Sequence, residues 1–212
     1  FITAGRGGGT GTGAAPVIAK IAKEIKLDDS VVEEILVVAV VTTPFEFEGE
    51  SRKAQALEGI EKLRKHVDSI LIIDNDRLRE MGNMKMSMAF AKADDVLFDA
   101  VKGISDIITK SKYVSVDFRD VNTVMKQSGT ALMGTGIGKG ENRAMEAIMA
   151  ASTSELLSDN DIRGAKNVLL YFSFHPYNEI LMDEIKEATE YLTQKIGGRK
   201  ANIIWGTGED EN

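Results

Sequence analysis

A run of small residues near the start of the chain has the composition of a phosphate-binding segment. It reads Gly7-Gly8-Gly9-Thr10-Gly11-Thr12-Gly13. Glycine N–H groups can converge on an anion because no Cβ intervenes, threonine hydroxyls add donors, and a helix start adds unpaired N–H groups. Helical periodicity over 14–24 predicts that helix, with Pro16 in its first turn. The run therefore predicts a cradle for nucleotide phosphates; a flexible glycine linker is the open alternative.

Two common nucleotide-binding patterns do not fit the chain. The Walker pattern Gly-x-x-x-x-Gly-Lys-Ser/Thr is absent, because Gly140 follows the lysine in the nearest match, 134–139. A Rossmann pattern can be placed on 9–14, but the next predicted strand closes with Thr42-Thr43-Pro44 and not with an acidic residue. A Rossmann-type dinucleotide-binding oxidoreductase therefore remains only as a second alternative.

The block from Ala4 to Pro16 closely resembles the signature of the tubulin/FtsZ family of GTPases, and its FtsZ branch in particular. Few other families place Gly-Gly-Gly-Thr-Gly-Thr-Gly between a strand and a helix. The resemblance implies a tubulin-like α/β fold, in which a Rossmann-like parallel-sheet GTPase half is joined by a long central helix to a smaller α/β C-terminal half. It extends over nearly the whole chain, weakens after Asp161, and implies a fragment that lacks the family's first and last strands.

The resemblance also assigns nucleotide contacts. Glu48 matches the glutamate that holds the ribose hydroxyls, and Arg52 a basic residue that reaches toward the phosphates. Asn75 and Phe90 match the asparagine that contacts guanine and the ring that stacks on the base. Asp94 matches the residue that reads the guanine edge, where a carboxylate can accept from both N1–H and the 2-amino group. Judged by residue type alone, Glu48 and Arg52 could form an ion pair at a helix start, and Phe90 could be a core residue.

A third segment, Val114–Val121, resembles the family's catalytic loop, which enters the nucleotide site of the next subunit in a filament. The resemblance implies that Asp117 and Asp120 orient and polarise the attacking water in trans. Taken alone, Asp120 could instead cap the following helix. Ser115 stands where the family has asparagine, and Arg6 where it usually has methionine beside the phosphates. These departures motivate the first alternative, a GTP-binding, polymerising relative with little or no hydrolysis.

The elements that must position these residues are predicted to alternate. Apolar runs predict strands at 35–41, 69–73, 131–133, 168–174 and 201–205. Periodicity predicts helices at 14–24, 51–66, 93–111, 121–126, 141–154 and 181–196. This alternation indicates α/β units on a mainly parallel sheet. We divide the chain into a GTP-binding half at 1–92, a central helix at 93–111 and an activation half at 112–212, and interpret Lys26–Glu34 as an insertion.

Composition limits the partners. The net charge of −7 over 212 residues argues against nucleic acid or an anionic membrane as a direct partner, and no run is apolar enough to span a bilayer. The chain has no cysteine, and we predict no metal-ligating side chains. The resemblance implies GTP/GDP and Mg²⁺ as ligands and head-to-tail self-association into the bacterial division ring. It also implies other division proteins as partners through regions outside this sequence, and a cytoplasmic location at the division site.

Overall fold

The chain divides into two compact units, one formed by residues 1–101 and 125–132 and the other by 102–124 and 133–212. The computed structural model describes residues 1–25, 35–80, 85–110, 113–153, 161–198 and 201–210. No helix in these ranges is long and apolar enough to cross a membrane. The predicted insertion at Lys26–Glu34 lies outside the described residues.

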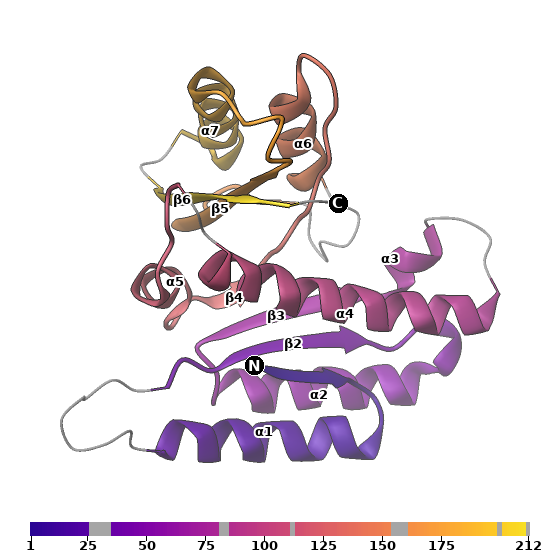
Figure 1. The fold of residues 1–212 in the computed structure, drawn as a ribbon. Coiled ribbons are helices and arrows are strands. Elements are labelled where there is room, and N and C mark those ends of the chain that lie inside the picture. The colour runs from indigo at the N-terminus through magenta and orange to yellow at the C-terminus, as the bar shows by residue number, and fades with distance from the viewer. Residues whose placement is uncertain (26–34, 81–84, 111–112, 154–160, 199–200, 211–212) are drawn as a thin grey trace. The chain divides into compact units, whose positions relative to one another are not determined.

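The first unit is built on a parallel sheet of four strands in the order β1-β2-β3-β4 (Figure 1). The strands are β1 Ile2–Gly5, β2 Val38–Thr43, β3 Ser69–Asp74 and β4 Gly129–Ala131. Its helices are α1 Gly9–Glu24, α2 Glu50–Arg64, α3 Asn75–Glu80 and most of α4, whose bounds are Met86–Thr109, with a short 3-10 turn at Glu46–Glu48. α1 and α2 lie on one face of the sheet and α4 on the other, which explains why β2 is apolar on both faces (Figure 1).

The core of this unit joins α1 and α2 to the sheet. Its buried members are Ala15, Ala19, Val37, Ala39, Val41, Ile60, Leu63 and Ile70. On the helices these residues recur at intervals of three or four, as the predicted periodicity requires. The packing holds the carboxyl ends of β1, β2 and β3 at one edge of the sheet, and the parallel α/β fold predicted from the sequence is confirmed.

Several predicted boundaries were wrong. α1 begins at Gly9 and not at residue 14, so most of the glycine-rich run is helical and Pro16 lies inside the helix and not in its first turn. Glycine has low helix propensity, but the helix packs so closely on β1 at this point that only glycine fits. A Cβ on Gly11 would clash with the carbonyl oxygen of Gly5. α4 begins at Met86 and not at residue 93, and α3 was not predicted. β2 begins at Val38 and not at residue 35, and it extends to Thr43, beyond its predicted end. β4 lies at 129–131 and not at 131–133.

The second unit has a parallel pair of strands, β5 Asn167–Phe174 and β6 Asn202–Glu209. Its helices are α6 Arg143–Ala151, α7 Met182–Ile196 and most of α5, whose bounds are Phe118–Met125. α5 and α6 were predicted from 121 and 141, and β6 continues past the predicted end at 205. Ile148, Ala188, Leu192 and Ile196 form a core on which apolar residues of β5 pack.

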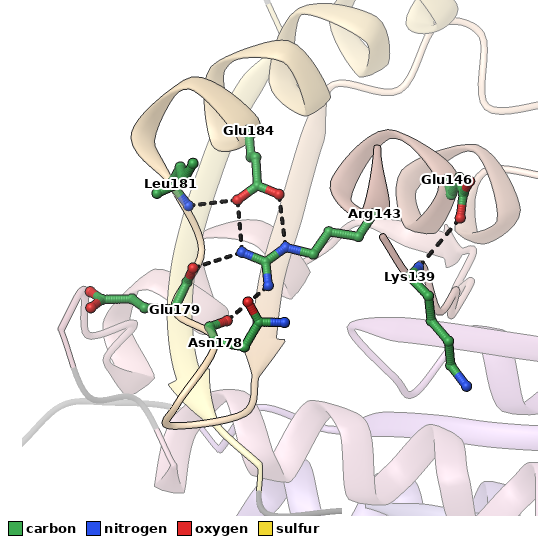
Figure 2. A network of polar contacts seen from close by, with 7 residues as sticks. All are labelled: Lys139, Arg143, Glu146, Asn178, Glu179, Leu181 and Glu184. Atoms are coloured by element: carbon green, nitrogen blue, oxygen red, sulfur yellow. Dashed lines mark hydrogen bonds and ion pairs between the residues drawn. The ribbon is translucent and has the colours of Figure 1, made fainter. Parts of the chain in front are cut away.

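Arg143 ties the start of α6 to the segment that precedes α7 (Figure 2). Its Nε and Nη2 donate to the two carboxylate oxygens of Glu184 at 2.8 and 3.0 Å, and Nη1 and Nη2 donate to the carbonyls of Asn178 and Glu179 at 2.9 and 2.6 Å. Glu184 also accepts from Leu181 N–H at 2.7 Å. The hydrogen bonds from Arg143 lower the pKa of Glu184. The contacts between Glu184 and Arg143 therefore stabilise the second unit most while Glu184 is ionised.

Replacing Glu184 with Gln is expected to destabilise the second unit by about 1–2 kcal/mol at neutral pH, because the charge-assisted bonds to Arg143 weaken. The folded pKa of Glu184 lies below its unfolded value, so its contribution is complete above about pH 4.3 and is lost as the pH falls through the folded value. Thermal unfolding measured from neutral to acidic pH should show the difference between variant and wild type shrinking toward low pH. A difference that stays constant would contradict this linkage.

Candidate functional site

The glycine-rich segment leaves the carboxyl end of β1 and runs directly into α1. Gly7 has a φ of 100°, a conformation that favours glycine, and its N–H donates to Thr12 Oγ1 at 3.2 Å. The first helical bond runs from Thr12 N–H to Gly8 O at 3.3 Å, so the N–H groups of 9–11 have no acceptor within the helix. Gly8, Gly9 and Thr10 are exposed. These donors and the positive end of the helix dipole suit an anion.

The loop after β2 packs against this segment. A Cβ on Gly7 would lie 3.2 Å from the carbonyl oxygen of Arg52 and 3.4 Å from Pro44 Cγ. Arg52 Nη1 donates to Glu48 Oε2 at 2.7 Å, and Glu48 Oε1 accepts from Phe45 N–H at 2.9 Å. The structure thus brings Glu48 and Arg52 together next to the glycine-rich segment. Their contact is the ion pair at a helix start that the residue types alone allow.

Three phenylalanines form an aromatic cluster in the first unit. Phe45 stacks on Phe47 with ring centroids 5.1 Å apart and contacts Phe90 edge to face at 5.3 Å. Phe45 is buried, whereas Phe90 is 42% and Phe47 55% exposed. Phe90 is therefore not a core residue, and its ring is accessible to a flat ligand. Phe47 was not singled out from the sequence; the Phe-Glu-Phe-Glu pattern at 45–48 is the signal that could have indicated two rings in different environments.

Two further predicted contacts lie in the same unit. Asn75 begins α3 at the carboxyl end of β3 and is buried, and its Oδ1 has no hydrogen-bond partner. Buried amide oxygens are nearly always paired, so this atom has the capacity to accept from a ligand. Asp94 is exposed on α4, four residues after Phe90 and thus on the same side of the helix.

The acidic loop belongs to the second unit. Asp120 N–H donates to Asp117 Oδ1 at 2.9 Å, and Asp117 N–H donates to Asp120 Oδ2 at 3.1 Å, which forms a reciprocal cap at the start of α5. Val116 is buried, and a Cβ on Gly206 of β6 would lie 2.5 Å from its Cγ2. Ser115 is exposed. The capping role left open for Asp120 is what these contacts show, and one oxygen of each carboxylate makes them.

Within the described ranges, no three His, Cys, Asp or Glu side chains are grouped so that they could hold a metal ion. Mg²⁺ that arrives with a nucleoside triphosphate takes most of its oxygen ligands from phosphate and water. The donor set of the first unit therefore fits Mg²⁺ only as a companion of the phosphates.

Two family models match the chain, one over each end. Residues 1–83 match the tubulin/FtsZ family, GTPase domain, and residues 129–212 match the FtsZ family, C-terminal domain. These matches include the glycine-rich segment, the loop after β2 and the α6–α7 unit.

Known proteins similar to this chain belong to the same group. The cell division protein FtsZ of Buchnera aphidicola subsp. Acyrthosiphon pisum is 52% identical over 212 residues, which cover 99% of this chain and 52% of that protein. The structure of an FtsZ dimer from M. jannaschii has a TM-score of 0.87 at 42% identity and matches 100% of this chain and 59% of that one. A GTPgS-bound protofilament of CetZ2 from Haloferax volcanii shares the fold, with a TM-score of 0.73 at 22% identity over 100% of this chain and 61% of that one. This chain spans about half the length of the curated relatives it matches.

Proposed function

This chain belongs to the FtsZ family of tubulin-like GTPases, and we propose that it is the part of a division protein that binds GTP and promotes its hydrolysis in a head-to-tail filament. One observation carries the binding half of this proposal: the exposed start of α1 follows β1 directly, and the Glu48–Arg52 pair packs beside it. Parallel α/β sheets bind their ligands at this edge, beyond the carboxyl ends of the strands.

Each part of GTP has a counterpart in the first unit. The phosphates bind the N–H groups of 8–11 at the start of α1, together with the hydroxyls of Thr10 and Thr12. Glu48 holds the ribose hydroxyls with lone pairs that its bonds to Phe45 and Arg52 leave over. Phe90 stacks on the base, while Asn75 and Asp94 accept from guanine. The half-exposed ring and the orphaned buried oxygen of Asn75 support this placement.

Hydrolysis is assigned to the acidic loop acting on a neighbouring subunit. Asp117 and Asp120 orient the attacking water, and Ser115 adds a hydroxyl to the same loop. The reciprocal cap supports this role because it fixes both carboxylates at the start of α5. Mg²⁺ bound with GTP would neutralise phosphate charge.

The same proposal includes the partners of the chain. The relatives include an FtsZ dimer, and we propose that this chain contacts copies of itself in a filament at the cytoplasmic division site. Other division proteins join through regions outside this sequence. The net charge of −7 supports the absence of a direct role for nucleic acid.

The base pocket is tested by replacing Asp94 with Ala in the full-length protein. GTP affinity is expected to fall roughly 10- to 100-fold while ATP affinity stays low, because a charge-assisted contact to guanine is lost. Asp95→Ala is the matched control, since Asp95 is also exposed on α4 but lies one position further round the helix. Equilibrium titration with GTP, ATP and NAD measures the effect. Unchanged GTP selectivity in the Asp94 variant would refute the pocket, and NAD binding would favour the oxidoreductase.

The alternative of a non-hydrolysing relative rests on Ser115 and Arg6, the two departures from the family pattern. Turnover separates it from the main proposal. If full-length protein binds GTP and forms filaments without releasing phosphate, the non-hydrolysing function replaces the catalytic one.

A further inference from the structure

Arg6 is a buried cation at the base of the glycine-rich segment. It follows β1, its backbone N–H donates to Thr42 O at 3.0 Å, and the residue is 4% exposed. Its Nη1 donates to Gly11 O at 2.7 Å and reaches Thr12 O at 3.5 Å. Its Nε and Nη2 are buried without a hydrogen-bond partner. Burial lowers the pKa of Arg6, as expected for a charge removed from water.

The guanidinium of Arg6 lies beside a backbone carbonyl of α1 that Pro16 leaves without its usual helical donor. Pro16 has no N–H, so Thr12 O lacks the donor that a helix normally supplies from four residues later. α2 packs closely at the same point, because a Cβ on Gly59 would lie 2.5 Å from Thr12 Cγ2 and 3.4 Å from Arg6 Nη1. Arg6 Nη1 therefore donates to Gly11 O and also lies within reach of the carbonyl that Pro16 leaves without a helical donor, at a point where the two helices pack closely.

The charge of Arg6 has no counterion within the described part of the chain, where its guanidinium donates only to backbone carbonyls. A buried charge without a partner is unfavourable, and the unpaired N–H groups at the start of α1 add positive potential to the same region. An anion at the helix start stabilises both the buried charge of Arg6 and the unpaired N–H groups, and a more highly charged anion stabilises them more.

We propose that Arg6 is a specificity-determining residue of the nucleotide site, whose buried positive charge makes the site prefer a nucleoside triphosphate to the diphosphate. The inference rests on the proposed function and concerns the number of phosphates, not the base. Arg6 acts through the field at the start of α1 and does not contact the ligand, so its charge and not its hydrogen bond sets the preference.

The test measures affinities for GDP and for GTPγS, a slowly hydrolysed analogue, in full-length protein with Arg6→Lys, Arg6→Gln and Arg6→Met. Lysine keeps the charge, glutamine keeps a donor without the charge, and methionine keeps neither. The preference for GTPγS is expected to fall about fivefold or more in the glutamine and methionine variants and to be retained by lysine. Arg64→Met is the control, because this substitution also removes one positive charge but does so at the far end of α2.

A double variant separates the loss of the charge from a loss of structure in α1. Combining Arg6→Met with Pro16→Ala returns a helical N–H to Thr12 O, which offsets part of the hydrogen bonding that α1 loses with the guanidinium, while the charge is absent. A reduced preference in this double variant supports the proposal. An unchanged ratio of the two affinities in the glutamine variant or in the double variant overturns it and leaves Arg6 as a brace for α1. If the wild type binds neither nucleotide, the proposed GTP-binding function itself fails.

Discussion

Full-length protein with Asp120→Ala should bind GTP as tightly as the wild type and lose turnover by about 10²–10⁴-fold, the contribution of a positioned general base. Asp120 lies in the second unit, whereas the proposed nucleotide contacts all lie in the first. Its removal therefore leaves the pocket of its own chain intact. Titration with GTP and steady-state phosphate release give the two quantities.

A matched variant separates catalysis from folding. Asp120→Ala also removes the acceptor of Asp117 N–H and is expected to destabilise α5 by about 1 kcal/mol. Asp120→Asn keeps an acceptor oxygen but lacks the negative charge. Loss of turnover in both variants would assign the effect to the carboxylate. Full activity in the asparagine variant would show that Asp120 serves only as a cap.

Hydrolysis in trans predicts a particular dependence of the rate on protein concentration. Hydrolysis should rise more steeply than linearly with protein concentration, because the proposed active site is complete only where two subunits meet. Mixing Asp120→Ala subunits with subunits that carry Phe90→Ala and Asp94→Ala should restore part of the activity, since one chain supplies the pocket and the other the loop. A turnover rate that is independent of concentration in monomeric protein would refute the mechanism.

The alternation of strands and helices could be predicted from the sequence because buried parallel strands and amphipathic helices have different periods. The start of α1 could not. Glycine has low helix propensity, and the close contact of Gly11 with β1 that outweighs this propensity appears only in three dimensions. The prediction of a loop up to residue 13 followed from local preference alone.

Part of the candidate site could likewise be predicted from the sequence, and part could not. The residue types of the glycine-rich run indicate phosphate binding, and the family resemblance supplies the order of the other contacts. The sequence could not show that the ring of Phe90 is half exposed, because a single aromatic residue at helical spacing is more often buried. Arg6 appeared only as a departure from the family. Its bond to Gly11 O depends on the path of α1 beside β1.

Gly11→Ala should be the most damaging small change in the first unit. A Cβ at this position would meet the carbonyl oxygen of Gly5, which is backbone and cannot rotate away, and Ala4 Cβ lies 3.3 Å from the same point. α1 must then move off β1, which separates the start of the helix from the loop after β2. We expect a loss of about 3 kcal/mol in unfolding free energy and a loss of GTP binding that exceeds the effect of Asp94→Ala.

Gly13→Ala is the matched comparison on the same helix. No atom outside the helix lies within 4 Å of the position a Cβ would take, and its backbone is helical. Alanine there should raise the unfolding free energy by about 0.5–1 kcal/mol, because it restricts the unfolded chain more than glycine does. Thermal unfolding of the two variants should therefore shift in opposite directions. Equal destabilisation would contradict this account, because helix propensity favours alanine at both positions and only Gly11 has the contact with β1.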